Sequence, residues 1–121
     1  MSYIYLNKYY IFKIKMAAAA DNNNNNNNIN IIKNRLARTY RGTIDVPTLY
    51  SSIDILSTDR IIVVKSLNNW AEGVGLLYSH ATQFPNKTKH LHIHNTHVNN
   101  DKLNKIMSLV NQLNINLTVE Q

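Results

Sequence analysis

The sequence of 121 residues contains no cysteine, three glycines, two prolines and only seven acidic residues. Without cysteine, the chain cannot form disulfides or use a thiol for catalysis or metal ligation. A glycine-rich phosphate loop is also excluded, because Gly73 and Gly75 lie within a helical pattern. No stretch approaches the ~18 consecutive apolar residues of a membrane-spanning helix. The length is typical of one domain, and we expect no transmembrane segment.

The amino-terminal part of the chain is basic and polar. Residues 1–44 hold seven lysines and arginines against one acid, whereas residues 45–121 hold six of each. Asp21 precedes seven consecutive asparagines, and such a tract buries too little apolar surface to offset the entropy of ordering it. We expect disorder over residues 17–34, a short basic helix over residues 31–40, and a mostly disordered, basic region over residues 1–41 as a whole.

The second half of the chain has the pattern of a strand–helix–strand–helix–strand module over residues 60–121. Three β-branched or alternating segments indicate strands: 61–65, 90–94 and 115–119. Two segments with apolar residues at steps of three and four indicate helices: 69–84 and 99–113. Successive right-handed crossovers would place both helices on one face of the sheet. The predicted fold class is therefore α/β, a two-layer sandwich whose other sheet face must be covered or polar.

Residues 42–59 form a connector whose structure the pattern leaves open. Residues 43–46 and 52–55 alternate between apolar and polar, which suggests half-buried strands. Pro47 would confine the first of them to a sheet edge. The connector either adds a strand to the sheet, beside Val119, or lies free of it. The two glycines within the first predicted helix favour close packing there, because glycine costs ~1 kcal/mol relative to alanine inside a helix.

The run His90-Leu91-His92-Ile93-His94 places three histidines on the same face of a strand, because side chains alternate with a period of two. Two such imidazoles can share a metal ion, but a zinc site needs a third and usually a fourth ligand. The run also resembles the histidine-triad motif of nucleotide hydrolases and transferases, although Asn95 and Thr96 follow it instead of two apolar residues. We interpret it mainly as a solvent-facing or interface strand. A metal or nucleotide site at His90, His92 and His94 is the remote alternative.

Several cations lie near the predicted ends of strands and starts of helices, where phosphate is commonly bound. Lys65 ends the first strand, and Lys102 begins the second helix on the same side of the sheet. The candidate nucleic-acid-binding residues are Arg60, Lys65, Lys89, Lys102 and Lys105. The alternative is that these are scattered, solvated charges. No catalytic residue and no cofactor is indicated.

The same element order, with the segment His90-Leu-His-Ile-His-Asn-Thr-His followed by Asp101-Lys102 and the helix that begins at Leu103, resembles the Alba superfamily. The most similar branch is the one found as small protein subunits of eukaryotic ribonuclease P and ribonuclease MRP. The resemblance covers residues 60–121. It implies backbone binding of RNA or DNA, RNA more than DNA, with Lys65 and Lys102 on phosphates. It also implies pairing with a like module and no catalysis. The family's fourth strand is missing after the last predicted strand.

The function expected from these observations is that of a non-catalytic, nucleic-acid-binding subunit of a ribonucleoprotein engaged in tRNA processing. A module of about 60 residues buries a small share of its surface, which favours a homodimer or heterodimer. The alternative is a small α/β protein-interaction module, similar to a STAS domain, without affinity for nucleic acid. The expected location is the nucleus or nucleolus, or the cytoplasm, with the mitochondrion as a further option.

Overall fold

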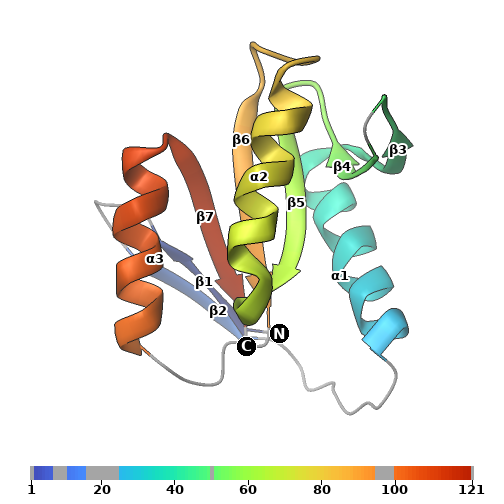
Figure 1. Cartoon of the computed structure of the whole chain (residues 1–121). Coiled ribbons are helices and arrows are strands. Elements are labelled where there is room, and N and C mark those ends of the chain that lie inside the picture. The colour runs from blue at the N-terminus through green and yellow to red at the C-terminus, as the bar shows by residue number, and fades with distance from the viewer. Residues whose placement is uncertain (1, 7–10, 16–24, 50, 95–99, 121) are drawn as a thin grey trace.

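The computed structural model describes residues 2–6, 11–15, 25–49, 51–94 and 100–120. Its centre is one mixed sheet with the strand order β2-β1-β7-β6-β5-β4-β3 (Figure 1). The strands are β1 Ser2–Leu6, β2 Ile11–Lys15, β3 Thr43–Pro47, β4 Ser52–Leu56, β5 Arg60–Ser66, β6 Thr88–His94 and β7 Ile115–Glu120. Strands β5, β6 and β7 run parallel to one another, and the other neighbouring pairs are antiparallel. The parallel centre is the sheet of the predicted module.

Two helices cover one face of this sheet, as predicted. α2, Trp70–Ala81, follows the 3-10 turn Leu67–Asn69 and packs over β5 and β6, while α3, Asn100–Gln112, packs over β7 (Figure 1). The core between the helices and the sheet is aliphatic, because alternate strand residues meet the apolar stripes of both helices. Its fully buried members include Ile61, Leu77, Leu91, Val110 and Val119. The α/β sandwich is therefore confirmed, with element bounds close to those predicted.

A third helix covers part of the opposite face. α1, Asn25–Tyr40, buries Ile32 and Leu36 against Ile55, Ile62 and Val64 of the sheet. The strand residues in this second core are those that alternate with the residues of the first core. The sheet is thus enclosed between layers on both sides along β4 and β5.

Helix α1 begins earlier than the sequence pattern indicates. The helix predicted over residues 31–40 is present, but its first residue is Asn25, so the last asparagines of the tract are helical. Residues 25–34 are therefore not disordered, because the apolar face that begins at Ile32 is buried on the sheet. Residues 17–24 of the segment for which we expected disorder lie outside the described residues. At the other end, the Gly42 N–H donates to Ala37 O at 2.9 Å, and Arg41 takes the left-handed conformation with φ 57°, which closes the helix as a Schellman cap does.

The connector forms a hairpin rather than a single strand. β3 pairs with β4, and β4 pairs with β5, so the hairpin extends the sheet on the β5 side. The position beside Val119, which was one of the two options for the connector, is taken by β1, whose Ile4 pairs with Val119. The antiparallel pairing with β5 follows from the short turn at Ser57–Asp59, since tight turns join only antiparallel strands.

Close packing at the first helical glycine is confirmed. A Cβ atom placed on Gly73 would lie 2.6 Å from Leu91 Cδ1 and 3.1 Å from Lys65 Cγ. At Gly75, by contrast, no heavy atom lies within 4 Å of such a Cβ. Gly73 therefore lets α2 approach β5 and β6, whereas Gly75 faces open space.

Candidate nucleic-acid interface

The positive charge of the protein belongs to the folded structure and not to a separate tail. Residues 25–120 hold ten lysines and arginines and six acids, a net charge of +4. The expectation of a neutral module with a basic tail is wrong, because α1 packs on the sheet and brings Lys33, Arg35 and Arg38 with it. A surface with this excess attracts polyanions by long-range electrostatics.

Two of the cations on α1 neutralise acids of the sheet. Lys33 Nζ lies 2.8 Å from Asp45 Oδ1 and 3.3 Å from Asp54 Oδ1. Burial alone would lower the pKa of Lys33, but the two carboxylates outweigh it and raise that pKa above its ordinary value. Arg35 forms an ion pair with the buried carboxylate of Glu120. These contacts attach α1 to the hairpin and to the last strand.

The surplus cations of α1 point the other way. Arg38 is exposed and lies two residues after the buried Leu36, which places it on the opposite side of the helix. Arg41 is exposed just beyond the helix end. Within the part of the chain that the structure describes, neither arginine has an ion pair. The sequence pattern assigned both residues to a basic tail, and their place on a folded surface could be predicted only once α1 was known to pack.

The structure divides the five predicted nucleic-acid-binding residues between the two ends of the sheet. Lys65 and Lys102 lie at the same edge, as predicted: Lys102 Nζ donates to Asn68 Oδ1 at 3.3 Å, in the turn that follows β5. Lys65 forms an ion pair with Glu72 of α2. Lys89 lies at the opposite end, with its Nζ 4.9 Å from the centre of the Tyr78 ring. Lys105 is exposed on α3.

Arg60 is only partly exposed, because other side chains surround its guanidinium group. Its Nη1 lies 3.0 Å from His90 Nδ1, and its guanidinium carbon lies 4.6 Å from the centre of the Tyr40 ring. Its Nε lies 3.6 Å from Asp59 Oδ1. Arg60 thus connects α1 to β6 through Tyr40 and His90. Because these contacts occupy its guanidinium group, we leave it out of the interface.

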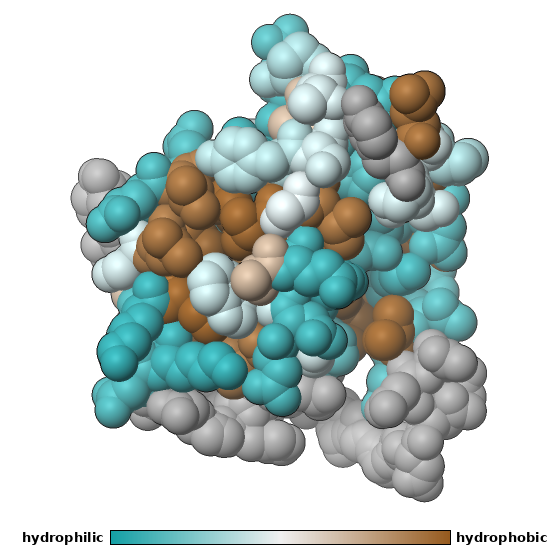
Figure 2. Space-filling model, viewed as in Figure 1, coloured by the Kyte–Doolittle hydropathy of each residue, from teal (hydrophilic) through white to brown (hydrophobic). Residues whose placement is uncertain are grey.

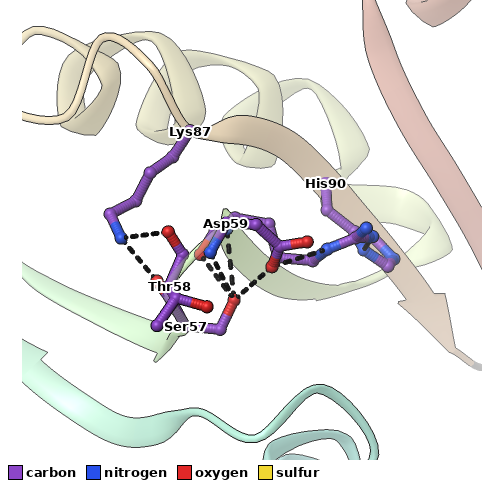
Figure 3. Close-up of polar contacts among 6 residues, drawn as sticks. Ser57, Thr58, Asp59, Lys87 and His90 are labelled. Atoms are coloured by element: carbon purple, nitrogen blue, oxygen red, sulfur yellow. Dashed lines mark hydrogen bonds and ion pairs between the residues drawn. The ribbon is translucent and has the colours of Figure 1, made fainter.

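The turn between β4 and β5 is held by a lysine from another segment and by the turn's own side chains (Figure 3). Lys87 Nζ, from the loop before β6, donates to Ser57 O at 2.6 Å and Thr58 O at 2.9 Å. Ser57 Oγ donates to Asp59 Oδ1 at 2.8 Å, and this bond is the main cause that lowers the pKa of Asp59. Lys87 therefore has a structural role at this turn.

A chain of buried hydrogen bonds crosses the α1 side of the sheet. His90 Nε2 lies 2.8 Å from Thr118 Oγ1, His92 Nδ1 lies 2.6 Å from the same oxygen, and His92 Nε2 lies 2.7 Å from Glu120 Oε1. Arginine has only donors, so Arg60 donates to His90 Nδ1, and His90 must donate onward to Thr118. The hydroxyl of Thr118 bridges the two rings, and His92 Nε2 donates to the Glu120 carboxylate.

The direction of this chain agrees with the protonation state of its first histidine. Burial, and secondarily the neighbouring His92 and Arg60, place the pKa of His90 well below its usual range. His90 is therefore neutral and can accept from one partner while donating to another. Its ring also packs edge-on against Tyr40, with centroids 5.3 Å apart.

The histidine strand is therefore a buried structural feature. His90 and His92 have no solvent-exposed surface, so the interpretation of a solvent-facing strand is wrong for both. Asn95 and Thr96, where the run departs from the histidine-triad motif, lie outside the described residues. Across the described ranges, no three histidine, aspartate or glutamate side chains are grouped so as to hold a metal ion. A substrate or metal would also have to displace α1 to reach the two rings.

Among the described helices, none combines the length and the apolar character that crossing a membrane requires. The apolar residues of all three helices instead form one-sided stripes on the sheet.

Comparison with known proteins finds similarity to KilA-N domain-containing proteins of Acanthamoeba polyphaga mimivirus. One is 31% identical over 88 residues, which are 73% of this chain and 35% of the relative. A second is 29% identical over 89 residues, 74% of this chain and 24% of the relative. A third is 31% identical over 62 residues, 51% of this chain and 17% of the relative. The chain thus spans about a third or less of the length of these curated relatives.

No family model matches the chain, and no solved structure matches it. The resemblance to the Alba superfamily is wrong, because the curated relatives are KilA-N domain-containing proteins and none is an Alba or ribonuclease P or MRP subunit. The element order that suggested it is present, but such an order is common to many two-layer α/β folds. The expectations of a ribonucleoprotein subunit and of tRNA processing depended on that resemblance and are wrong with it. The chain is thus similar to mimivirus KilA-N domain-containing proteins over 51–74% of its length.

Proposed function

We propose that this chain is a non-catalytic DNA-binding unit that contacts phosphates with two exposed arginines, Arg38 near the carboxyl end of α1 and Arg41 just beyond it. The observation that carries the proposal is the +4 charge of residues 25–120, of which Arg38 and Arg41 form an outward-facing part. The similarity to KilA-N domain-containing proteins supports DNA as the polyanion, since KilA-N domains are a DNA-binding family.

Arg38 and Arg41 suit phosphate contacts for two physical reasons. Guanidinium groups match phosphate oxygens with two parallel hydrogen bonds, which a lysine cannot do. The helix that carries the arginines is also fixed, because Lys33 and Arg35 attach it to Asp45, Asp54 and Glu120. Contacts of this kind position a protein on DNA and give affinity without reading bases.

The test is a binding series with the full chain and a fluorescently labelled 30-base-pair duplex, measured by anisotropy at several salt concentrations. We expect Arg38→Gln/Arg41→Gln to weaken binding at least tenfold at low salt. Two lost phosphate contacts should also lower the slope of log affinity against log salt by about 1.8, at ~0.9 per contact. A scrambled duplex of the same length should bind as well as the original, since phosphate contacts carry no sequence information.

The matched control is Lys102→Gln/Lys105→Gln, which removes the same charge from α3. The predicted phosphate contacts at Lys65, Lys89, Lys102 and Lys105 stay a prediction, and this control tests Lys102 and Lys105. If the lysine pair abolishes binding and the arginine pair leaves it unchanged, DNA lies on α3 and the role given to α1 is wrong. If the unmodified chain binds no duplex at low salt, the DNA-binding function itself is wrong. The same series with single-stranded RNA decides between the two nucleic acids.

A further inference from the structure

The face that carries α2 and α3 has an apolar area between the two helices (Figure 2). Tyr78 on α2 and Leu109 on α3 are 42% and 39% exposed, and they are two of the four large apolar or aromatic side chains that are exposed in the described ranges. The half-buried Trp70, Val74 and Leu113 lie beside them, on the flanks of the core. We call these five residues the apolar strip. Trp70, Val74 and Tyr78 follow one another at steps of four, so they occupy one flank of α2.

Contacts at the two ends of the strip join the helices that border it. Tyr78 Oη donates to Leu113 O at 2.6 Å, which joins the end of α2 to the end of α3. Lys102 Nζ donates to Asn68 Oδ1 at 3.3 Å, which joins the start of α3 to the turn before α2. Between these contacts the two helices run along the sheet (Figure 1). The 13 residues of α3 make it about 20 Å long at 1.5 Å per residue, which is enough for about three turns of a bound helix.

The charges around the strip are mostly positive, with Asp101 at the start of α3 as an exposed acid beside Lys102. Lys102 and Lys105 precede Leu109 by seven and four residues, which puts them on the same flank of α3. Lys89 lies at the other end, against the Tyr78 ring. The acid on α2, Glu72, is already paired with Lys65. An apolar strip bordered by lysines is complementary to apolar side chains flanked by carboxylates.

We propose that the apolar strip binds an acidic amphipathic helix of a partner protein, with its leucine-like side chains between α2 and α3 and its carboxylates on Lys89, Lys102 and Lys105. This is the helix-in-groove mode of recognition, in which apolar residues at steps of three and four dock on a preformed apolar surface. Because α2 and α3 are fixed on the sheet and joined at both ends, the surface loses little conformational entropy on binding.

A second copy of the chain fits the strip less well. A two-fold interface brings the same patch of both copies together, so lysine would face lysine across it. Duplex DNA also fits less well, because the middle of the strip offers apolar side chains where phosphates need donors. The proposal does not depend on the DNA-binding function, which is assigned to arginines on the other side of the sheet.

The test uses the full chain and two labelled synthetic helices with leucines at the same positions, one with glutamates on its polar face and one with lysines. Fluorescence anisotropy should show binding of the glutamate peptide and at least tenfold weaker binding of the lysine peptide. Lys102→Glu/Lys105→Glu should weaken binding of the glutamate peptide at least fivefold and strengthen binding of the lysine peptide. Leu109→Gln should weaken binding of both peptides. It should leave the thermal midpoint of unfolding within a few degrees of the unmodified chain, because this side chain is already partly exposed.

Three outcomes would overturn the proposal. The first is equal affinity for the two peptides, or no measurable affinity for either one at 100 µM. The second is a concentration-dependent dimer that Leu109→Gln dissociates, which would make a second copy the occupant. The third is displacement of the glutamate peptide by duplex DNA from the unmodified chain and equally from Arg38→Gln/Arg41→Gln, which would place DNA on the strip. If only Arg38→Gln/Arg41→Gln loses duplex binding, the result supports the proposed DNA-binding function. It does not bear on peptide binding at the strip.

Discussion

Replacing Thr118 by valine tests whether the buried hydrogen-bond chain is assembled as the structure implies. The hydroxyl of Thr118 links the two histidines, at 2.8 Å from His90 Nε2 and 2.6 Å from His92 Nδ1. Valine has nearly the same shape, so the change removes the two hydrogen bonds without making a cavity. Both ring nitrogens then lose the hydroxyl and stay buried, because neither histidine has solvent-exposed surface.

The expected change in the free energy of unfolding follows from the two ring nitrogens, His90 Nε2 and His92 Nδ1, that lose the hydroxyl. A buried polar group left without a partner costs about 1–3 kcal/mol, and the added methyl group of valine returns up to about 1 kcal/mol. We expect Thr118→Val to lower the free energy of unfolding by about 2–4 kcal/mol. Thr118→Ser keeps the hydroxyl and removes one buried methyl, so it should cost only about 1 kcal/mol.

Urea unfolding monitored by circular dichroism measures both variants, and an unchanged m-value would show that the unfolded states are comparable. The reasoning requires the order wild type, then serine, then valine. If valine is within about 0.5 kcal/mol of wild type, or is less destabilising than serine, the hydroxyl does not connect the two rings and the direction derived for the chain is wrong.

Further predictions concern packing and pH. Gly73→Ala should lower stability by about 1–3 kcal/mol, because its Cβ would meet Leu91 Cδ1 at 2.6 Å, whereas Gly75→Ala, in open space, should raise it by about 0.5–1 kcal/mol; thermal melts of the two variants give opposite shifts. Stability should fall as the pH falls below about 6.5, because the histidines whose pKa is lowered in the fold gain protons only on unfolding; these are His80, His90 and His94. Each adds a slope of up to about 1.4 kcal/mol per pH unit, and a urea midpoint that is flat between pH 7 and 5 would contradict the burial of these rings.

The parallel module was predictable because its signals are local. The run at residues 61–64 and the alternation at 90–94 and 115–119 identify strands by period, and the two apolar stripes identify helices. The packing of Gly73 was also predictable, since a glycine inside a helix has a cost that some contact must offset. None of these inferences needs knowledge of a distant segment.

The second face of the sheet was not predictable from the same signals. Asparagine is a poor helix former, and Ile32 and Leu36 give only a narrow stripe, so nothing local shows that α1 packs on the strands. Without α1, the alternation of His90 and His92 with apolar residues indicates a strand with one solvent-exposed face. The pairing of Glu120 with Arg35 joins residues 85 positions apart, and a period of two cannot indicate such a contact. The histidines were therefore placed on the correct face but in the wrong environment.

The packing of α1 changes which experiment can test a role for the basic amino-terminal region. Removing residues 1–41 would remove the exposed arginines, but it would also remove Ile32 and Leu36 from the second core and leave Glu120 buried without Arg35. Glu120 would keep His92 Nε2 at 2.7 Å but lose its arginine, and breaking a buried ion pair costs about 3–5 kcal/mol, which is a large share of the 5–15 kcal/mol that stabilises a typical domain. Loss of DNA binding after this truncation would follow from unfolding as readily as from lost contacts. Substitution of Arg38 and Arg41 leaves the inward face of α1 intact, so only the point variants separate the two causes.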